Sequence, residues 1–144
     1  MAKAYIERFL MSRTHAIYAQ YQNETSVASA TPPQLVAIVY QRLLDHLYAA
    51  KVQLAEQSDT TESLTKAINL ISTGLESSLD KEKGGRIAQN LSLIYGWSIN
   101  EIVRARITRD PEMIQDVINV FAPLAEGWRE LAGYKDGSFF AINE

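Results

Sequence analysis

Residues 64–95 read LTKAINLISTGLESSLDKEKGGRIAQNLSLIY, and this stretch decides the class of fold. Apolar residues recur in it at steps of three or four on both sides of a glycine pair: Leu64, Ile68, Ile71, Leu75 and Leu79 before the pair, and Ile87, Leu91 and Ile94 after it. This spacing lines one face of an α-helix with apolar side chains. The stretch therefore predicts two amphipathic helices that meet near the glycines.

The glycine pair itself, Gly84-Gly85, lies between Lys83 and Arg86 and invites comparison with a phosphate-binding loop. Walker and Rossmann loops need G-x-x-x-x-G-K-[ST] or G-x-G-x-x-G directly after a β-strand. Neither spacing is present, and the residues before the pair have helical periodicity. We therefore interpret the glycines as a connection between helices and expect no cofactor.

Further helix boundaries lie on either side of this stretch. Thr31-Pro32-Pro33-Gln34 combines an N-cap, a first-turn proline and the glutamine of a capping box, and Asp110-Pro111 repeats the cap and proline. We expect helices over about 32–57, 60–80, 84–109 and 111–131. Because the connections are short, neighbouring helices should be antiparallel. The predicted fold is all-α, an antiparallel up-down-up-down four-helix bundle over residues 31–132.

The two ends of the chain differ from the bundle in pattern. Residues 1–30 hold an amphipathic aromatic segment followed by a small polar linker, and we expect the segment to pack on the bundle. Residues 133–144 contain two glycines and the pair Phe139-Phe140 without helical periodicity. They predict a flexible C-terminal tail whose role the sequence does not define.

Charge and composition exclude several classes of function. The net charge of −3 leaves no basic surplus to neutralise phosphates, so we expect no nucleic-acid partner. The chain has no cysteine, and no stretch approaches the roughly 20 apolar residues of a membrane span. The N-terminus also lacks the apolar core of a signal peptide. We therefore expect a cytoplasmic protein without membrane insertion.

Catalytic and metal-binding patterns are missing from the sequence. Di-iron bundles need a glutamate three residues before each ligating histidine, whereas Ser12 precedes His15 and Leu43 precedes His46 at that spacing. The nucleophile elbow G-x-S-x-G does not occur either. The sequence therefore predicts no catalytic residue, no metal site and no enzyme activity.

The first long helix has more apolar positions than one stripe requires: Leu35, Val36, Ile38, Val39, Leu43, Leu44, Leu47 and Tyr48. One interpretation is that these residues, like the two tryptophans, simply fill or edge the core. The other is that a broad apolar surface forms a groove for a further amphipathic helix. In that case the N-terminal segment would cover the groove when no partner is bound.

Residues 64–95 also strongly resemble the flagellin export chaperone family known as FliS. The resemblance is carried by Lys-Ala-Ile-Asn-x-Ile, Leu-Asp-x-Glu-Lys-Gly-Gly and Ile-Ala-x-Asn-Leu runs, here at Lys66 to Ile71, Leu79 to Gly85 and Ile87 to Leu91, with Tyr95 following. Weaker matches are Tyr18 with Gln20, Thr31-Pro32, and Ala125 with Trp128. The similarity runs from about residue 17 to residue 131.

The resemblance implies a non-catalytic chaperone. Family members are antiparallel helical bundles that bind the disordered C-terminal segment of flagellin in the cytoplasm, prevent its premature polymerisation and deliver it to the flagellar export gate. We expect a monomer or weak homo-oligomer. The candidate partner-binding residues are Tyr18, Gln20, Leu35, Ile38, Tyr40, Ile68, Ile71, Leu75, Leu91 and Tyr95.

The sequence departs from the family pattern after Tyr95. The family usually continues with Asp-Tyr-Met and then two arginines, whereas this chain has Gly96, Trp97, Ser98, Asn100 and Glu101. These changes leave open an adaptor for another flagellar or secretion-system protein. A small-bundle enzyme or ligand carrier is the remaining alternative from a different class.

Overall fold

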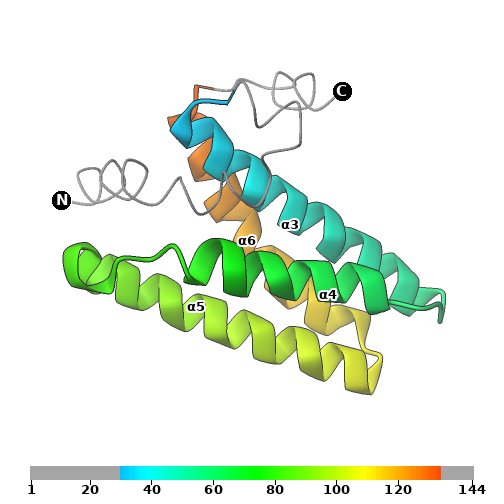
Figure 1. Ribbon diagram of the computed structural model, residues 1–144. Coiled ribbons are helices and arrows are strands. Elements are labelled where there is room, and N and C mark those ends of the chain that lie inside the picture. Colours follow the sequence, from blue (N-terminus) through cyan, green and yellow to red (C-terminus); the bar gives the residue numbers. More distant parts are fainter. Residues whose placement is uncertain (1–29, 134–144) are drawn as a thin grey trace.

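The computed structural model describes residues 30–133, which form five consecutive helical elements: α3 (Pro32–Ala55), α4 (Thr61–Asn69), the π-helix η1 (Leu70–Glu76), α5 (Lys81–Thr108) and α6 (Pro111–Leu131). No strand occurs within residues 30–133, so the predicted all-α class is confirmed. Each long helical segment runs back along the one before it (Figure 1). The predicted N-terminal segment and C-terminal tail fall in residues 1–29 and 134–144, outside the described part.

Side-chain caps set where the first and last helices begin. The Thr31 hydroxyl accepts a hydrogen bond from the Gln34 amide at 3.4 Å, and Gln34 Oε1 accepts one from the Thr31 amide at 3.0 Å. This reciprocal pair is the predicted capping box. At α6, the Asp110 carboxylate accepts from the Glu112 amide at 3.0 Å, and Pro111 follows as the first helical residue. Both helices therefore begin where the sequence places them.

The second helical segment differs from the single α-helix expected over 60–80. It is α-helical only to Asn69 and continues as the π-helix η1 to Glu76. Four hydroxyls along this segment, those of Ser72, Thr73, Ser77 and Ser78, donate to the carbonyl four residues earlier. Such bonds compete with the regular helical pattern and bend helices. Gly74, within η1, adds no side chain that would resist the wider turn.

The glycine pair also lies differently from the expectation. The Asp80 carboxylate accepts from the Lys83 amide at 3.0 Å, so α5 begins at Lys81 rather than at residue 84, and Gly84 lies in its first turn. The interruption is at Gly85, whose backbone angles are φ 55° and ψ −133°. These angles lie outside the regions open to residues with a Cβ. One glycine of the pair therefore makes the break.

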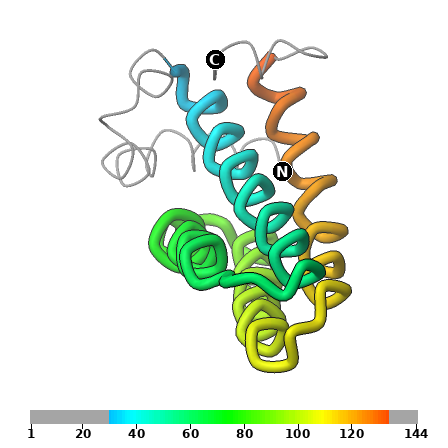
Figure 2. Tube along the Cα trace, turned by 90° about the vertical axis from the view of Figure 1, so that its right-hand side faces the viewer, coloured from blue at the N-terminus to red at the C-terminus, as the bar shows by residue number. Residues whose placement is uncertain are grey.

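The helices form two pairs that meet closely at one end and separate at the other. α3 packs most extensively against α6 and also against α4, while η1 packs against α5, so that α4, η1 and α5 lie beside the α3–α6 pair. In Figures 1 and 2 the first half of α3 and the last half of α6 extend away from the other pair. At the opposite end, the Arg109 guanidinium donates to the Ser58 carbonyl at 2.6 Å and to the Thr60 hydroxyl at 3.4 Å. We call this contact the Arg109 clamp.

Gly85→Ala is expected to lower the free energy of unfolding by about 1–3 kcal/mol, because alanine would be held in a backbone conformation that it rarely adopts. A Cβ at Gly85 meets nothing within 4 Å, so the loss would report backbone strain alone. Gly96→Ala is the matched control, since Gly96 also faces open space and lies within a regular helix. There we expect a gain of up to about 1 kcal/mol. Urea denaturation measures the free energy of unfolding of both variants. Equal changes in the two variants would contradict the conclusion that position 85 requires glycine for its backbone conformation.

Candidate partner-binding groove

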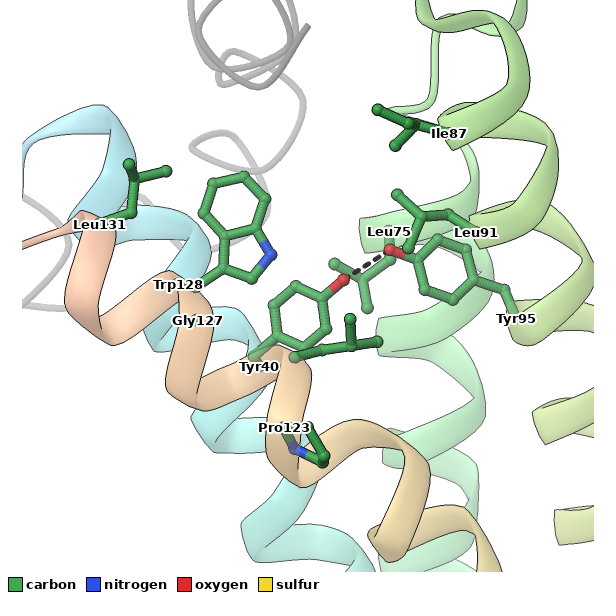
Figure 3. Close-up of a pocket in the computed structure, with 10 residues that line it drawn as sticks. Tyr40, Leu75, Ile87, Leu91, Tyr95, Pro123, Gly127, Trp128 and Leu131 are labelled. Atoms are coloured by element: carbon green, nitrogen blue, oxygen red, sulfur yellow. Dashed lines mark hydrogen bonds between the residues drawn. The ribbon is translucent and has the colours of Figure 1, made fainter. Parts of the chain in front are cut away.

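A groove opens where the two helix pairs separate, with the last half of α6 on one side and η1 with the first half of α5 on the other (Figure 3). Its volume is about 310 Å³. None of the ten residues that line it is charged, so its surface suits apolar side chains. The lining residues are Tyr40, Leu75, Ile87, Leu91, Tyr95, Pro123, Leu124, Gly127, Trp128 and Leu131.

Aromatic side chains form the floor of the groove. The hydroxyls of Tyr40 on α3 and Tyr95 on α5 are 2.6 Å apart and share a hydrogen bond, although both residues are at most 2% exposed. Phe121 lies 6.0 Å from Tyr40 and 6.1 Å from Tyr95 between ring centroids, and Trp128 stacks on Tyr40 at 6.2 Å. These separations are typical of favourable aromatic pairs. The floor is thus a packed cluster contributed by three helices.

The walls of the groove are only partly buried. Ile87 and Leu91 on α5, and Leu124 and Trp128 on α6, are half-buried, and Leu131 at the rim is 40% exposed. A bound apolar chain would remove this remaining surface from water, which is favourable. The wall also contains a gap at Gly127, where a Cβ would meet nothing within 4 Å. The groove can therefore accept side chains without rearranging its neighbours.

The structure brings together four of the ten predicted partner-binding residues: Tyr40, Leu75, Leu91 and Tyr95. Leu35 and Ile71 are buried in the main core, and Ile68 is half-buried against it. Ile38 is buried beside Ala37 in a small separate cluster that packs on Trp128. The other two predicted residues, Tyr18 and Gln20, lie outside the described part of the chain.

The α6 wall was absent from the predicted set. Leu124, Trp128 and Leu131 continue the apolar spacing of Ile114, Val117, Ile118 and Phe121, which are fully or almost fully buried. The apolar stripe of α6 therefore runs from the core into the groove wall, and its three- and four-residue spacing does not change at the boundary. Gly127, next to Trp128, is the sequence signal for the change, since it removes a side chain from the wall.

Outside the groove the described residues offer little further chemistry. Within residues 30–133 there is no group of three or more His, Cys, Asp or Glu side chains placed to hold a metal ion. None of the helices described there is both long and apolar enough to cross a membrane. His46 is half-buried on α3, and its pKa is lowered by burial and, second, by the positive charge of Lys66.

His46→Gln is expected to reduce the loss of stability on mild acidification. Because the pKa of His46 is lower in the folded chain than its ordinary value of 6.5, the unfolded chain binds this proton first. Protonation of the unfolded chain at His46 therefore lowers the free energy of unfolding only below about pH 6.5. The loss grows as the pH falls further toward the pKa of the folded chain. Urea denaturation at about pH 7.5 and about pH 5.5 should show the larger drop in the wild type. Equal losses of stability in the wild type and in His46→Gln would contradict the lowered pKa of His46.

The Tyr40–Tyr95 hydrogen bond should be measurable by a double-mutant cycle. Each single change, Tyr40→Phe or Tyr95→Phe, removes the same bond and should cost about 1 kcal/mol of stability. The double variant should lose less than the sum of the singles, by about 0.5–1 kcal/mol, because the bond can be lost only once. If the losses of the two single variants add up to that of the double variant, the hydrogen bond between the two hydroxyls does not contribute to stability.

Comparison with known proteins places this chain among flagellar proteins. The sequence model of the family described as "Flagellar protein FliS" matches residues 14–135, a range that includes every groove-lining residue. The flagellar secretion chaperone FliS of Salmonella typhimurium is 38% identical over 118 residues, which cover 80% of this chain and 87% of that protein. FliS of Escherichia coli K12 is 31% identical over 78% of this chain and 85% of its own length. FliS of Campylobacter jejuni is 32% identical over 84% of this chain and 94% of its own length.

Proposed function

The chain belongs to the FliS family of flagellar secretion chaperones, and from this premise we propose that it binds the disordered C-terminal segment of flagellin in the cytoplasm. Binding keeps that segment from polymerising prematurely until the complex reaches the flagellar export apparatus. The family is one of chaperones and not of enzymes, in agreement with the predicted lack of catalysis.

The observation that supports this proposal most directly is the uncharged groove between α5 and α6. An amphipathic helix docks by placing its apolar face in such a groove. The volume of about 310 Å³ lies at the lower end of the range for ligand pockets, which fits a few apolar side chains from one helix face. A segment that is disordered when free also meets an ordering cost, so it needs apolar burial of this kind to bind.

We assign direct contacts with flagellin to eight residues, four of them on α5 or α6 beyond those predicted from the sequence: Tyr40, Leu75, Leu91, Tyr95, Ile87, Leu124, Trp128 and Leu131. Leu35, Ile38, Ile68 and Ile71 would support the helices that carry these contacts, since they are packed against core clusters. Tyr18 and Gln20 are proposed to act at the same surface through the N-terminal segment.

Tryptophan fluorescence tests the proposal directly. The chain has two tryptophans, so Trp97→Phe leaves Trp128, at the groove, as the single reporter. A peptide of the flagellin C-terminal segment should shift its emission to the blue and raise the helical signal in circular dichroism as it docks. No saturable change at tens of micromolar peptide would overturn the proposal for that flagellin. Recovery of a different dominant flagellar protein by pull-down would favour the adaptor alternative.

Filling the groove should block binding without unfolding the chain. Gly127→Leu adds a side chain where a Cβ meets open space, and leucine has a better helix propensity than glycine by up to about 1 kcal/mol. We expect unchanged or higher thermal stability. Peptide binding should be at least about tenfold weaker, because the added leucine would fill the space that an apolar side chain of the partner needs. Gly96→Leu, at an open helical position away from the groove, should keep full affinity. Unchanged affinity of Gly127→Leu would exclude the groove as the binding site.

A further inference from the structure

The open end of the groove lies between the start of α5 and the end of α6, and a charged residue stands there on each wall. Figure 3 shows Ile87 and Leu131 on opposite walls toward this end. Arg86 comes directly before Ile87 and is exposed. Glu130 comes directly before Leu131 and is exposed as well. Neither charge belongs to an ion pair within residues 30–133, and we call these two residues the rim charges.

The flank of the α5 wall that is open to water is the one that carries Arg86. Successive residues of an α-helix turn by about 100°, so Arg86 lies on one flank of this wall and Ser92 on the other. The Ser92 flank is covered, because the Ser92 hydroxyl donates to the Glu76 carboxylate of η1 at 2.8 Å. A helix that lies in the groove therefore passes beside the Arg86 guanidinium.

The α6 wall has the same arrangement. Trp128 packs on α3, so the flank of α6 on that side is covered. Glu130 lies about 160° from Trp128 around the helix and about 60° from Gly127, which lines the groove. The neighbouring charges Glu126 and Arg129 are paired with each other at 3.1 Å. Glu130 is therefore the charge that the α6 wall offers to a bound helix.

The other charges at the start of α5 offset one another. Lys81 is paired with Glu76 at 3.3 Å. Glu82 and Lys83 are adjacent, exposed and opposite in charge. Arg86 therefore gives the α5 rim its positive sign, as Glu130 gives the α6 rim its negative sign.

The helix dipoles strengthen this contrast between the two walls. The N-terminus of a helix carries a partial positive charge and the C-terminus a partial negative charge. Because Gly85 interrupts α5, Arg86 stands in the first turn of its uninterrupted part, while Glu130 stands in the last turn of α6. Each rim charge thus has the sign that is unfavourable for its own helix. Helix stability does not account for these two charges, whereas contact with a charged partner does.

We propose that the groove selects a partner helix whose apolar face has an acidic residue on the edge toward α5 and a basic residue on the edge toward α6. This inference rests on the function proposed above and adds the charge pattern of the bound segment. Opposite charges at the edge of an interface speed association and reject partners that bring like charges together. The apolar contacts supply most of the affinity, and the rim charges supply the choice between partners.

Three synthetic helices test this selection. They share one apolar face of leucine and alanine and differ at its two edges: glutamate on one and lysine on the other (mixed), glutamate on both (acidic), or lysine on both (basic). Trp128 fluorescence in the Trp97→Phe chain measures their binding. We expect the mixed peptide to bind at least about threefold tighter than either of the others at low salt. The difference should shrink at about 1 M salt, where charges are screened within about 3 Å.

Reversing one rim charge should change the preferred peptide. Glu130→Arg makes both rims basic and should make the acidic peptide the tightest of the three, whereas Arg86→Glu should favour the basic peptide. Both changes suit the helix dipoles, so thermal stability should be unchanged or higher. Arg106→Glu is the matched control, because it changes the net charge as Arg86→Glu does at an exposed position about 22 Å beyond Leu91 along α5. It should still prefer the mixed peptide.

Two results would overturn the selection by the rim charges. One is equal binding of the three peptides by the wild type. The other is a change of preference in Arg106→Glu that equals the change in Arg86→Glu, since net charge would then decide. If none of the three peptides binds while the flagellin peptide still shifts Trp128 fluorescence, this inference fails and the proposed function stands. If the flagellin peptide fails to bind as well, both fail.

Discussion

The hydrogen bond between the Tyr40 and Tyr95 hydroxyls ties α3 to α5 at the point where the two helix pairs separate. Purely aliphatic walls at this point would favour closure, because contact between them would bury the apolar surface of the groove. The tyrosine rings, packed on Phe121, instead set a fixed spacing between the helices. Groove width and floor both depend on this cluster, so the shape of the groove is a property of the core itself.

Local sequence signals predicted the helices and much of one groove wall. Apolar spacing and caps predict the starts of α3 and α6, and four predicted contact residues meet around the groove. The α6 wall was not predictable from periodicity, since Leu124 and Trp128 have the spacing of core residues. Whether such a residue is core or wall depends on how far the helices diverge. The π-helix was missed because hydroxyl bonds to the backbone leave the apolar spacing of its segment intact.

The two faces of α5 have different surroundings. Tyr95 and Ile102 point into the bundle and are almost completely buried, whereas Leu93 and Ile107 are more than two-thirds exposed on the other side.

The Arg109 clamp fixes the two helix pairs to each other at one end of the molecule and leaves them apart at the groove. It joins the turn before α4 to the turn before α6, while the groove lies toward the other end. Leu91 is eighteen residues, or about 27 Å, from Arg109 along α5. A rotation of about 5° about the clamp would therefore move the groove wall by about 2.4 Å over this distance. Such a rotation would change the width of the groove while the contacts at the Arg109 end stay in place.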